Sequence, residues 1–134
     1  MDFDFSCFKK DESRIREGVV VQSEYDPFPF YKLRSAEYGA YQKFLDKKGI
    51  ANITNPKQRR RVICEGIAKF LFLGISSNED GPFENDSDEV EKMLNKYERF
   101  RNEVSGFAQK RELHEDIEVD DFDEQEEVES DSKN

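Results

Sequence analysis

The sequence predicts an α+β fold in which a short N-terminal β-hairpin or small sheet packs on about three α-helices, followed by a disordered acidic C-terminal tail. β-Branched and aromatic residues gather early in the chain, over positions 19–33, as is typical of strands. Later segments repeat apolar residues at helical spacing. Residues 115–134 hold eleven acids and one base, a composition that cannot bury enough apolar surface to fold alone.

A chain of 134 residues has the length of one domain. We therefore expect a single small globular domain over residues 1–111 and a disordered acidic tail over residues 112–134. Residues 115–134 carry the whole formal net charge of −10, so residues 1–114 are neutral. This division is typical of an adaptor with a solvating or docking appendage.

Cysteine usage and the apolar runs predict a cytoplasmic protein. Cys7 and Cys64 lie far apart and form no CxxC motif, which fits a reducing compartment. The N-terminus, MDFDFSCFKK, is acidic and lacks the apolar stretch of a signal peptide. The apolar run over residues 62–75 contains Glu65 and Lys69, and it is too short and too charged to cross a membrane.

The N-terminal region predicts strands. Residues 1–10 alternate between apolar and polar types, which indicates a half-buried strand, and the polar residues 9–17 indicate a loop. Residues 18–33 then predict a hairpin with a turn at Asp26-Pro27. Since a proline cannot donate to a strand ladder, the second strand is either an edge strand or begins after Pro29.

An aromatic-rich stretch, residues 24–45, holds seven Phe and Tyr residues in a chain without tryptophan. Ser35 is a suitable N-cap for a helix there, and Gly49 is a suitable end. Because the rings follow helical spacing, we expect a core and not a surface for stacking bases. The rings expected to pack against Phe70, Leu71 and the last helix are Phe28, Phe30, Tyr38, Tyr41 and Phe44.

Two more helices follow. Asn55-Pro56 is an N-cap with proline at the first helical position, and the apolar stripe after it predicts a helix through Gly74. Residues 76–87 read as a loop. Asp86 and Glu89 can form a capping box for a final helix over residues 87–108. Its heptad positions hold Val90, Met93, Tyr97, Phe100, Val104 and Phe107.

No pattern in the chain predicts catalysis, a metal site, a cofactor or a small-molecule substrate. The single histidine, His114, falls at the edge of the predicted tail, where a base cannot be positioned. No phosphate-binding glycine loop is present. The acidic segment over residues 78–89 does not match the calcium-loop spacing. The sequence therefore predicts a protein that is not an enzyme.

A basic cluster is the strongest sign of nucleic-acid binding; it consists of Lys57, Arg59, Arg60 and Arg61. The core-facing spacing of the aromatic residues, the neutral body and the competing acidic tail argue against that function. The basic cluster can also be interpreted as a solvated helix face or as a docking place for the acidic tail. The tail itself intersperses Ile117, Val119, Phe122 and Val128 among acids, a pattern that suits either docking into a hydrophobic groove or solubility alone.

The segment VVVQSEYDPFPFYKLRSAEYGAYQKF, residues 19–44, resembles the small tail-assembly chaperones of tailed bacteriophages. In that family a short β element, roughly "vvv…PF.F.kL.s.EY..Y..F", precedes a helical body. The resemblance implies a protein without catalytic residues that binds the long tape-measure protein and tail-tube subunits in the host cytoplasm until the tail polymerises. The heptad helix would suit a helical partner.

We therefore expect a non-enzymatic assembly chaperone or adaptor with a helical protein partner. The residues expected to bind it are Val90, Met93, Tyr97, Phe100, Val104, Phe107 and Phe122. The alternative is an acidic inhibitor that, like a DNA mimic, occupies a basic nucleic-acid-binding groove on another protein. The sequence leaves open whether the chain self-associates, and it predicts contact with neither membrane nor nucleic acid.

Overall fold

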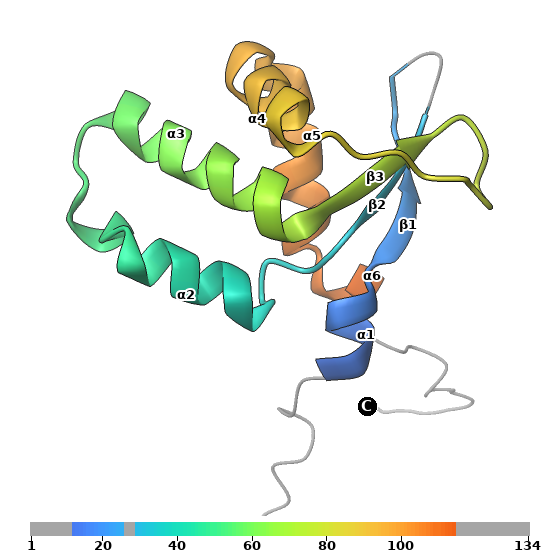
Figure 1. The fold of residues 1–134 in the computed structure, drawn as a ribbon, viewed down its shortest axis with the longest axis horizontal. Helices are drawn as coiled ribbons and strands as arrows, with labels where there is room; N and C mark the ends of the chain where they lie inside the picture. The colour runs from blue at the N-terminus through green and yellow to red at the C-terminus, as the bar shows by residue number, and fades with distance from the viewer. Residues whose placement is uncertain (1–11, 26–28, 115–134) are drawn as a thin grey trace, which may run out of the picture.

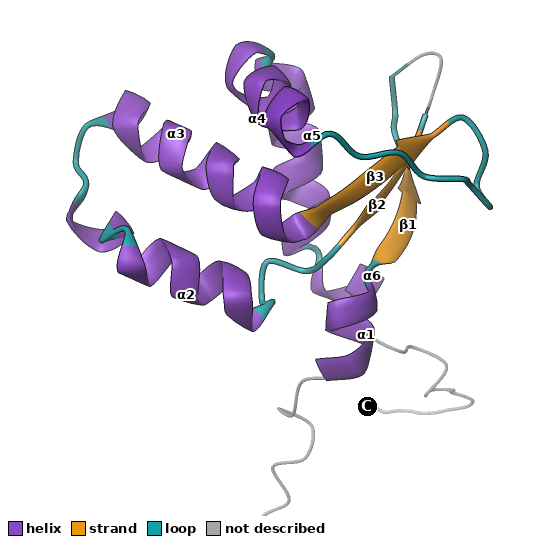
Figure 2. Ribbon diagram, viewed as in Figure 1, coloured by secondary structure: helices purple, strands orange, loops and turns teal. Residues whose placement is uncertain are grey.

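The computed structural model describes residues 12–25 and 29–114, and it has the predicted α+β fold (Figure 1). An antiparallel three-stranded sheet, in the order β1-β2-β3, lies to one side of the larger helices (Figure 2). The strands are β1 (Val19–Gln22), β2 (Phe30–Leu33) and β3 (Phe72–Ser76). The helices are α1 (Glu12–Glu17), α2 (Gly39–Lys47), α3 (Pro56–Gly66), α4 (Ser87–Lys96), α5 (Glu98–Gln109) and α6 (Arg111–His114).

The predicted hairpin is confirmed. β1 pairs antiparallel with β2, and Val21 lies opposite Tyr31. Of the two alternatives for the second strand, the structure shows the one that begins after Pro29. This strand is central in the sheet and is not an edge strand. The predicted turn at Asp26-Pro27, the ring of Phe28 and the predicted strand over residues 1–10 lie outside the described residues.

The predicted loop over residues 9–17 is wrong for residues 12–17, which form α1. Ile15 is only 4% exposed, so this short helix is held by burial of one apolar side chain. Gly18 ends the helix with a φ of 81°, a conformation that favours glycine, and its N–H donates to the Arg14 carbonyl at 3.0 Å.

The first large helix begins later than the sequence predicts. Ser35 does not cap a helix; its hydroxyl accepts a hydrogen bond from the Glu37 N–H at 3.1 Å in a turn. α2 starts at Gly39. It ends where predicted, because Gly49 adopts the left-handed conformation with a φ of 69°.

The next helix begins as predicted and ends earlier. Asn55 Oδ1 accepts a hydrogen bond from the Gln58 N–H at 3.0 Å, which caps α3. The helix then widens into one π-helical turn (Ile67–Leu71), and the chain continues as β3. The prediction of helix through Gly74 is therefore wrong, because Phe72–Ser76 pairs with the second edge of β2. A short apolar run fits a buried helix or a buried strand equally well.

The predicted heptad helix over residues 87–108 is two helices. Asp86 Oδ1 accepts a hydrogen bond of 3.2 Å from the Glu89 N–H, which is one half of the expected capping box. The chain turns at Tyr97, whose φ and ψ are −110° and 108°, before α5 begins. Arg101 Nη1 donates to the Leu94 carbonyl at 2.9 Å and so satisfies one of the carbonyl groups left unpaired at the end of α4.

Most of the predicted aromatic core is confirmed. Tyr41 is 6% exposed, Tyr38 packs against the core, and the rings of Phe44 and Phe70 lie 5.3 Å apart. Phe30 is only half-buried, because the alternation of β2 directs Tyr31 into the core instead.

Tyr31 belongs to an aromatic cluster between the sheet and α5. Its ring centroid lies 5.7 Å from that of Phe72 and 5.8 Å from that of Phe100. The cluster packs the central strand and β3 against α5, and this packing sets where α5 lies relative to the end of the hairpin.

Candidate functional site

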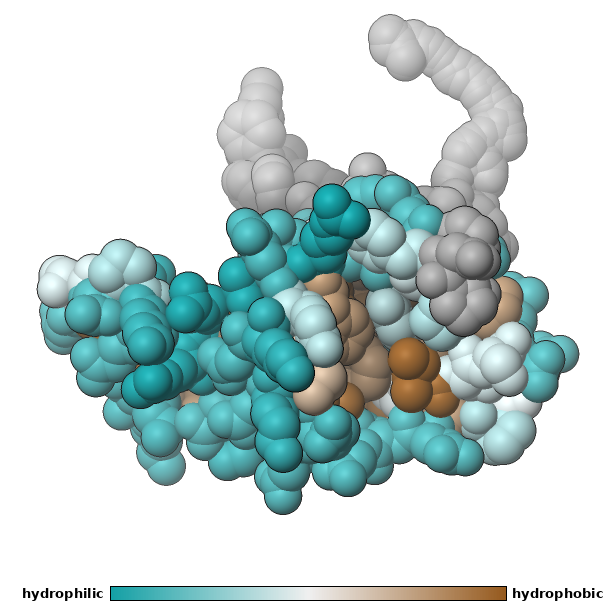
Figure 3. Space-filling view, turned by 90° about the horizontal axis from the view of Figure 1, so that it is seen from above, coloured by the Kyte–Doolittle hydropathy of each residue, from teal (hydrophilic) through white to brown (hydrophobic). Residues whose placement is uncertain are grey.

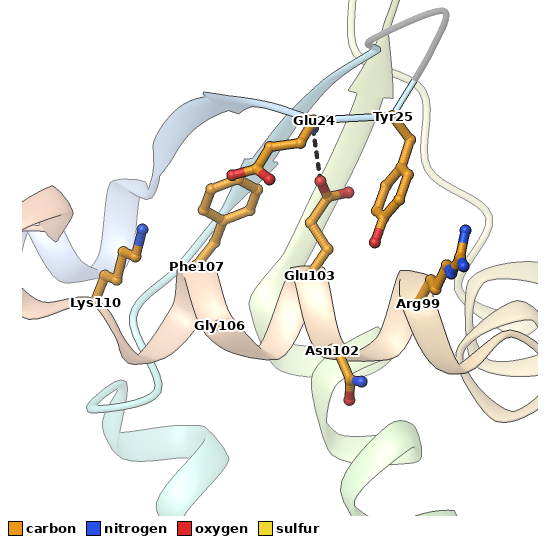
Figure 4. Close-up of a pocket in the computed structure, with 8 residues that line it drawn as sticks. All are labelled: Glu24, Tyr25, Arg99, Asn102, Glu103, Gly106, Phe107 and Lys110. Atoms are coloured by element: carbon orange, nitrogen blue, oxygen red, sulfur yellow. Dashed lines mark hydrogen bonds between the residues drawn. The ribbon is translucent and has the colours of Figure 1, made fainter.

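A groove of about 280 Å³ runs between the end of the β1–β2 hairpin and α5, and we call it the hairpin groove (Figure 4). The hairpin contributes Glu24 and Tyr25, and the other wall comes from α5 and the residue after it. The residues lining it on that side are Arg99, Asn102, Glu103, Gly106, Phe107 and Lys110.

Helical periodicity brings four of these residues onto one face. At 3.6 residues per turn, Arg99, Glu103, Gly106 and Lys110 fall within about 60° of one another around the helix axis. Arg99 and Lys110 lie at the two ends of the groove and Gly106 lies between them. An ideal Cβ built on Gly106 meets no atom within 4 Å, so this part of the groove is open.

Glu103 holds the hairpin in place over the helix. Its Oε1 accepts hydrogen bonds from the Ser23 hydroxyl at 2.8 Å and the Tyr31 hydroxyl at 3.0 Å. Its Oε2 accepts one from the Glu24 N–H at 2.7 Å, drawn in Figure 4. Hydrogen bonds to an ionised carboxylate are among the stronger ones. Glu103 is therefore a structural part of the groove wall.

The pKa values of the tyrosines reflect this packing. Burial, together with the neighbouring Glu103 carboxylate, raises the pKa of Tyr31 to about 12, although its contact with Ser23 acts in the opposite direction. Burial also raises the pKa of Tyr41. Neither hydroxyl is therefore suited to ionise near neutral pH.

The hairpin groove offers two rings and two cations. Tyr25 is 46% exposed, and its ring extends from the hairpin toward α5 (Figure 4). Phe107 is half-buried and packs on the core with its other side. The Lys110 ammonium lies 5.9 Å from the centroid of the Phe107 ring. A peptide segment with an apolar side chain between two acids matches this arrangement.

The face seen from above in Figure 3 is mostly hydrophilic, and its hydrophobic side chains gather in a small area near the middle. Among the described residues, the large hydrophobic side chains that are well exposed are Val20, Tyr25, Ile75 and Tyr97. They are scattered over different elements, so Tyr25 is distinguished by its position in a groove and not by belonging to a broad apolar patch.

The residues of the expected partner-binding surface differ in their exposure. Val104 is fully buried and cannot contact a partner while the protein is folded. Phe100 is partly buried and packs in the aromatic cluster. Val90 is half-buried against the core, and Met93 is half-buried on α4. Tyr97 is 50% exposed at the turn between the two helices, Phe107 lines the hairpin groove, and Phe122 lies outside the described residues.

The basic cluster is only partly assembled into one site. Lys57, Arg60 and Arg61 line a second hollow of about 650 Å³ with Lys92 of α4. Three acids, Glu65, Asp88 and Glu91, line the same hollow, which reduces its attraction for a polyanion.

Arg59 has a structural contact outside this hollow. Its Nη1 donates to the Ile50 carbonyl at 2.7 Å. Its guanidinium therefore holds the loop before α3 instead of joining the other three cations.

Two described groups that could carry chemistry, His114 and Cys64, are enclosed. His114, expected to lie unpositioned at the edge of the tail, is instead 3% exposed in α6, and its Nε2 lies 2.9 Å from the Phe107 carbonyl oxygen. Burial lowers its pKa. Cys64 is fully buried, and burial raises the pKa of its thiol. Within residues 12–25 and 29–114, no cluster of three or more His, Cys, Asp or Glu side chains could hold a metal ion.

Sequence reasoning missed most of the hairpin groove, including Tyr25, Arg99, Glu103, Gly106 and Lys110. The only signal for the helix side was the repeat of polar and small residues at i, i+4, i+7 and i+11, which an exposed helix face also produces. Nothing local connects Glu103 with Ser23, because their contact joins residues 80 positions apart.

The comparisons with known proteins add no family. No protein-family model matches the chain, and no curated protein or solved structure is significantly similar to it. Among the described helices, none is long and apolar enough to cross a membrane.

Proposed function

We propose that the protein is a non-enzymatic protein-binding adaptor or assembly chaperone that works in the cytoplasm and holds a helical segment of its partner in the hairpin groove. The observation that carries the proposal is the open groove itself, with the exposed Tyr25 ring on one wall and Gly106 leaving space on the other. Helix-in-groove binding uses apolar anchors at helical spacing.

The dimensions of the hairpin groove support such a partner. Arg99 and Lys110, the residue after α5, are eleven positions apart, a length of about 16 Å that corresponds to about three turns of a partner helix lying alongside. The rings of Tyr25 and Phe107 would contact its apolar stripe. The two cations would contact acids at its ends. The resemblance of residues 19–44 to phage tail-assembly chaperones suggests tape-measure and tail-tube proteins as partners.

The test fills the hairpin groove without disturbing the core. Gly106→Trp adds a large ring at a position where a Cβ meets nothing within 4 Å. Gly39→Trp is the matched control, because Gly39 also begins from open space and lies on α2, away from the groove. Each full-length variant would be immobilised and exposed to a lysate of the native host at low and high salt, with captured proteins identified by mass spectrometry.

We expect the unmodified protein and Gly39→Trp to retain the same partner at both salt concentrations, and Gly106→Trp to lose it. Far-ultraviolet circular dichroism would check that all three are folded. Equal capture by all three proteins would exclude the hairpin groove as the binding site. Release of the partner by salt alone would favour the acidic-inhibitor alternative, because exposed charge pairs are screened.

A further inference from the structure

We infer that the acidic segment of this chain at residues 115–123 occupies the hairpin groove when no partner is bound. This inference uses the groove of the proposed function but does not depend on any partner. It starts from where the described chain ends. His114 is fixed against the last turn of α5 by the contact between its Nε2 and the Phe107 carbonyl. The described chain therefore ends only four positions after Lys110, which lies at one end of the groove.

The composition of the segment matches the groove. Residues 115–123 read EDIEVDDFD, in which Ile117, Val119 and Phe122 are separated by acids. The groove presents Tyr25 and Phe107 for the apolar side chains. Its exposed cations, Arg99 and Lys110, lie at the two ends.

The lengths also match. The cations are about 16 Å apart along the helix axis. An extended chain covers about 3.3 Å per residue, so the five steps from Asp116 to Asp121 span the same distance. The segment can thus bring one acid near each cation, with Ile117 and Val119 between the two acids and Phe122 directly after the second.

Two acids of the groove oppose an acidic occupant, and neutral hydrogen-bond donors partly offset the charge of one of them. Both oxygens of Glu103 already accept hydrogen bonds from the hairpin and the central strand. Glu24 is exposed at the margin, where solvent screens its charge. A tethered segment needs little affinity, since its effective concentration at the groove is in the millimolar range for a short linker, by order of magnitude.

The second hollow, beside the basic cluster, is the competing place for the segment. It carries four cations, but three acids share it and Val62 is its single apolar lining residue. Nothing there matches the three apolar side chains of the segment. The hairpin groove is therefore the better complement, although its net charge is lower.

The absence of tryptophan gives a direct test in the full-length protein. Phe122→Trp places a single indole in the segment, and its emission reports burial. We expect a blue-shifted emission and a several-fold weaker quenching by acrylamide than in a free peptide of residues 115–134 carrying the same substitution. Both effects should be unchanged by dilution, because the contact is within one chain, and both should weaken as salt rises.

Two double variants, each of which reverses two positive charges, then locate the site. Arg99→Glu with Lys110→Glu should return the emission and the quenching to those of the free peptide. Lys57→Glu with Lys92→Glu changes the net charge equally at the second hollow and should leave the indole buried. Circular dichroism would check that both variants are folded.

If Lys57→Glu with Lys92→Glu exposes the indole and Arg99→Glu with Lys110→Glu leaves it buried, the inference is overturned and the segment is assigned to the basic cluster. Emission equal to that of the free peptide would overturn it entirely, while the Gly106→Trp capture experiment would still decide the proposed function. A blue shift that disappears on dilution would also overturn it, because the occupant would then be the segment of a second copy.

Discussion

The hydroxyl of Tyr31, in the central strand, donates a hydrogen bond of 3.0 Å to the carboxylate of Glu103 on α5. The two residues lie 72 positions apart in the chain. The same carboxylate holds Ser23 and Glu24 at the end of the hairpin. This single side chain therefore joins the sheet, the hairpin and the helix that together form the hairpin groove.

We expect Tyr31 and Glu103 to be energetically coupled. Tyr31→Phe keeps the ring in its cluster and removes one hydrogen bond to a charged group, which should lower the free energy of unfolding by about 1–3 kcal/mol. Glu103→Gln should cost a similar amount, because an amide offers one oxygen acceptor where the carboxylate offers two. Urea unfolding of both single variants and the double variant should give a coupling energy of about 1 kcal/mol. Additive losses would contradict the coupling.

Stability should depend on alkaline pH through Tyr31. Its folded pKa of about 12 lies above the ordinary tyrosine pKa of 10.0, so folding favours the neutral phenol. The stabilisation is fully present below about pH 10 and is lost as the pH rises toward 12. Tyr41, whose pKa burial also raises, contributes in the same direction.

Urea unfolding at several alkaline pH values would measure this dependence. Tyr31→Phe should lose stability less steeply than the unmodified protein over that range, because the variant keeps only the contribution of the other groups. Parallel pH dependence of the two proteins would show that Tyr31 titrates normally in the folded state.

His114 should make the protein less stable in mild acid. Burial lowers its folded pKa from 6.5, so the folded state favours neutral imidazole. The stabilisation is therefore present above about pH 6.5 and is lost as the pH falls through the folded pKa. Since Nε2 faces a carbonyl oxygen, Nδ1 would take the added proton, and it has no hydrogen-bond partner among the described residues.

Thermal unfolding at about pH 8 and about pH 5 would measure this effect, because the histidine of the unfolded chain titrates between them. His114→Gln can still donate to the Phe107 carbonyl and cannot ionise, so its melting temperature should fall less between the two conditions. An equal fall in both proteins would assign the acid sensitivity to other groups.

Two helical glycines should respond to alanine with opposite signs. Gly106→Ala should raise the free energy of unfolding by up to about 1 kcal/mol, because alanine favours the helix and the new Cβ meets open space. Gly66→Ala gains the same propensity, but its Cβ would lie 2.8 Å from Tyr41 Cε1 and 3.1 Å from Phe44 Cδ2. We therefore expect it to be destabilised overall.

Urea unfolding of the two variants compares helix propensity with packing directly. A gain in stability for both would mean that the rings beside Gly66 can move aside at little cost. A loss for both would mean that the space beside Gly106 is not open in solution.

The sequence alone determined the class of the fold and several element boundaries. The valines before the turn predicted the first strand. Asn55-Pro56 predicted the start of α3, and Gly49 predicted the end of α2. Each of these depends on the conformational preference of one or a few neighbouring residues, or on a cap between residues three apart. Such preferences can be read without knowing the rest of the molecule.

Only the tertiary structure decided that Phe72–Ser76 is a strand, that the heptad pattern breaks at Tyr97, and that Val104 faces the core. It also decided that the end of the hairpin and α5 meet around Glu103 to form the hairpin groove. These outcomes depend on pairing with an open strand edge and on hydrogen bonds between distant residues. Neither leaves a periodic or local signal, because the free energy that selects them comes from contacts that exist only in the assembled fold.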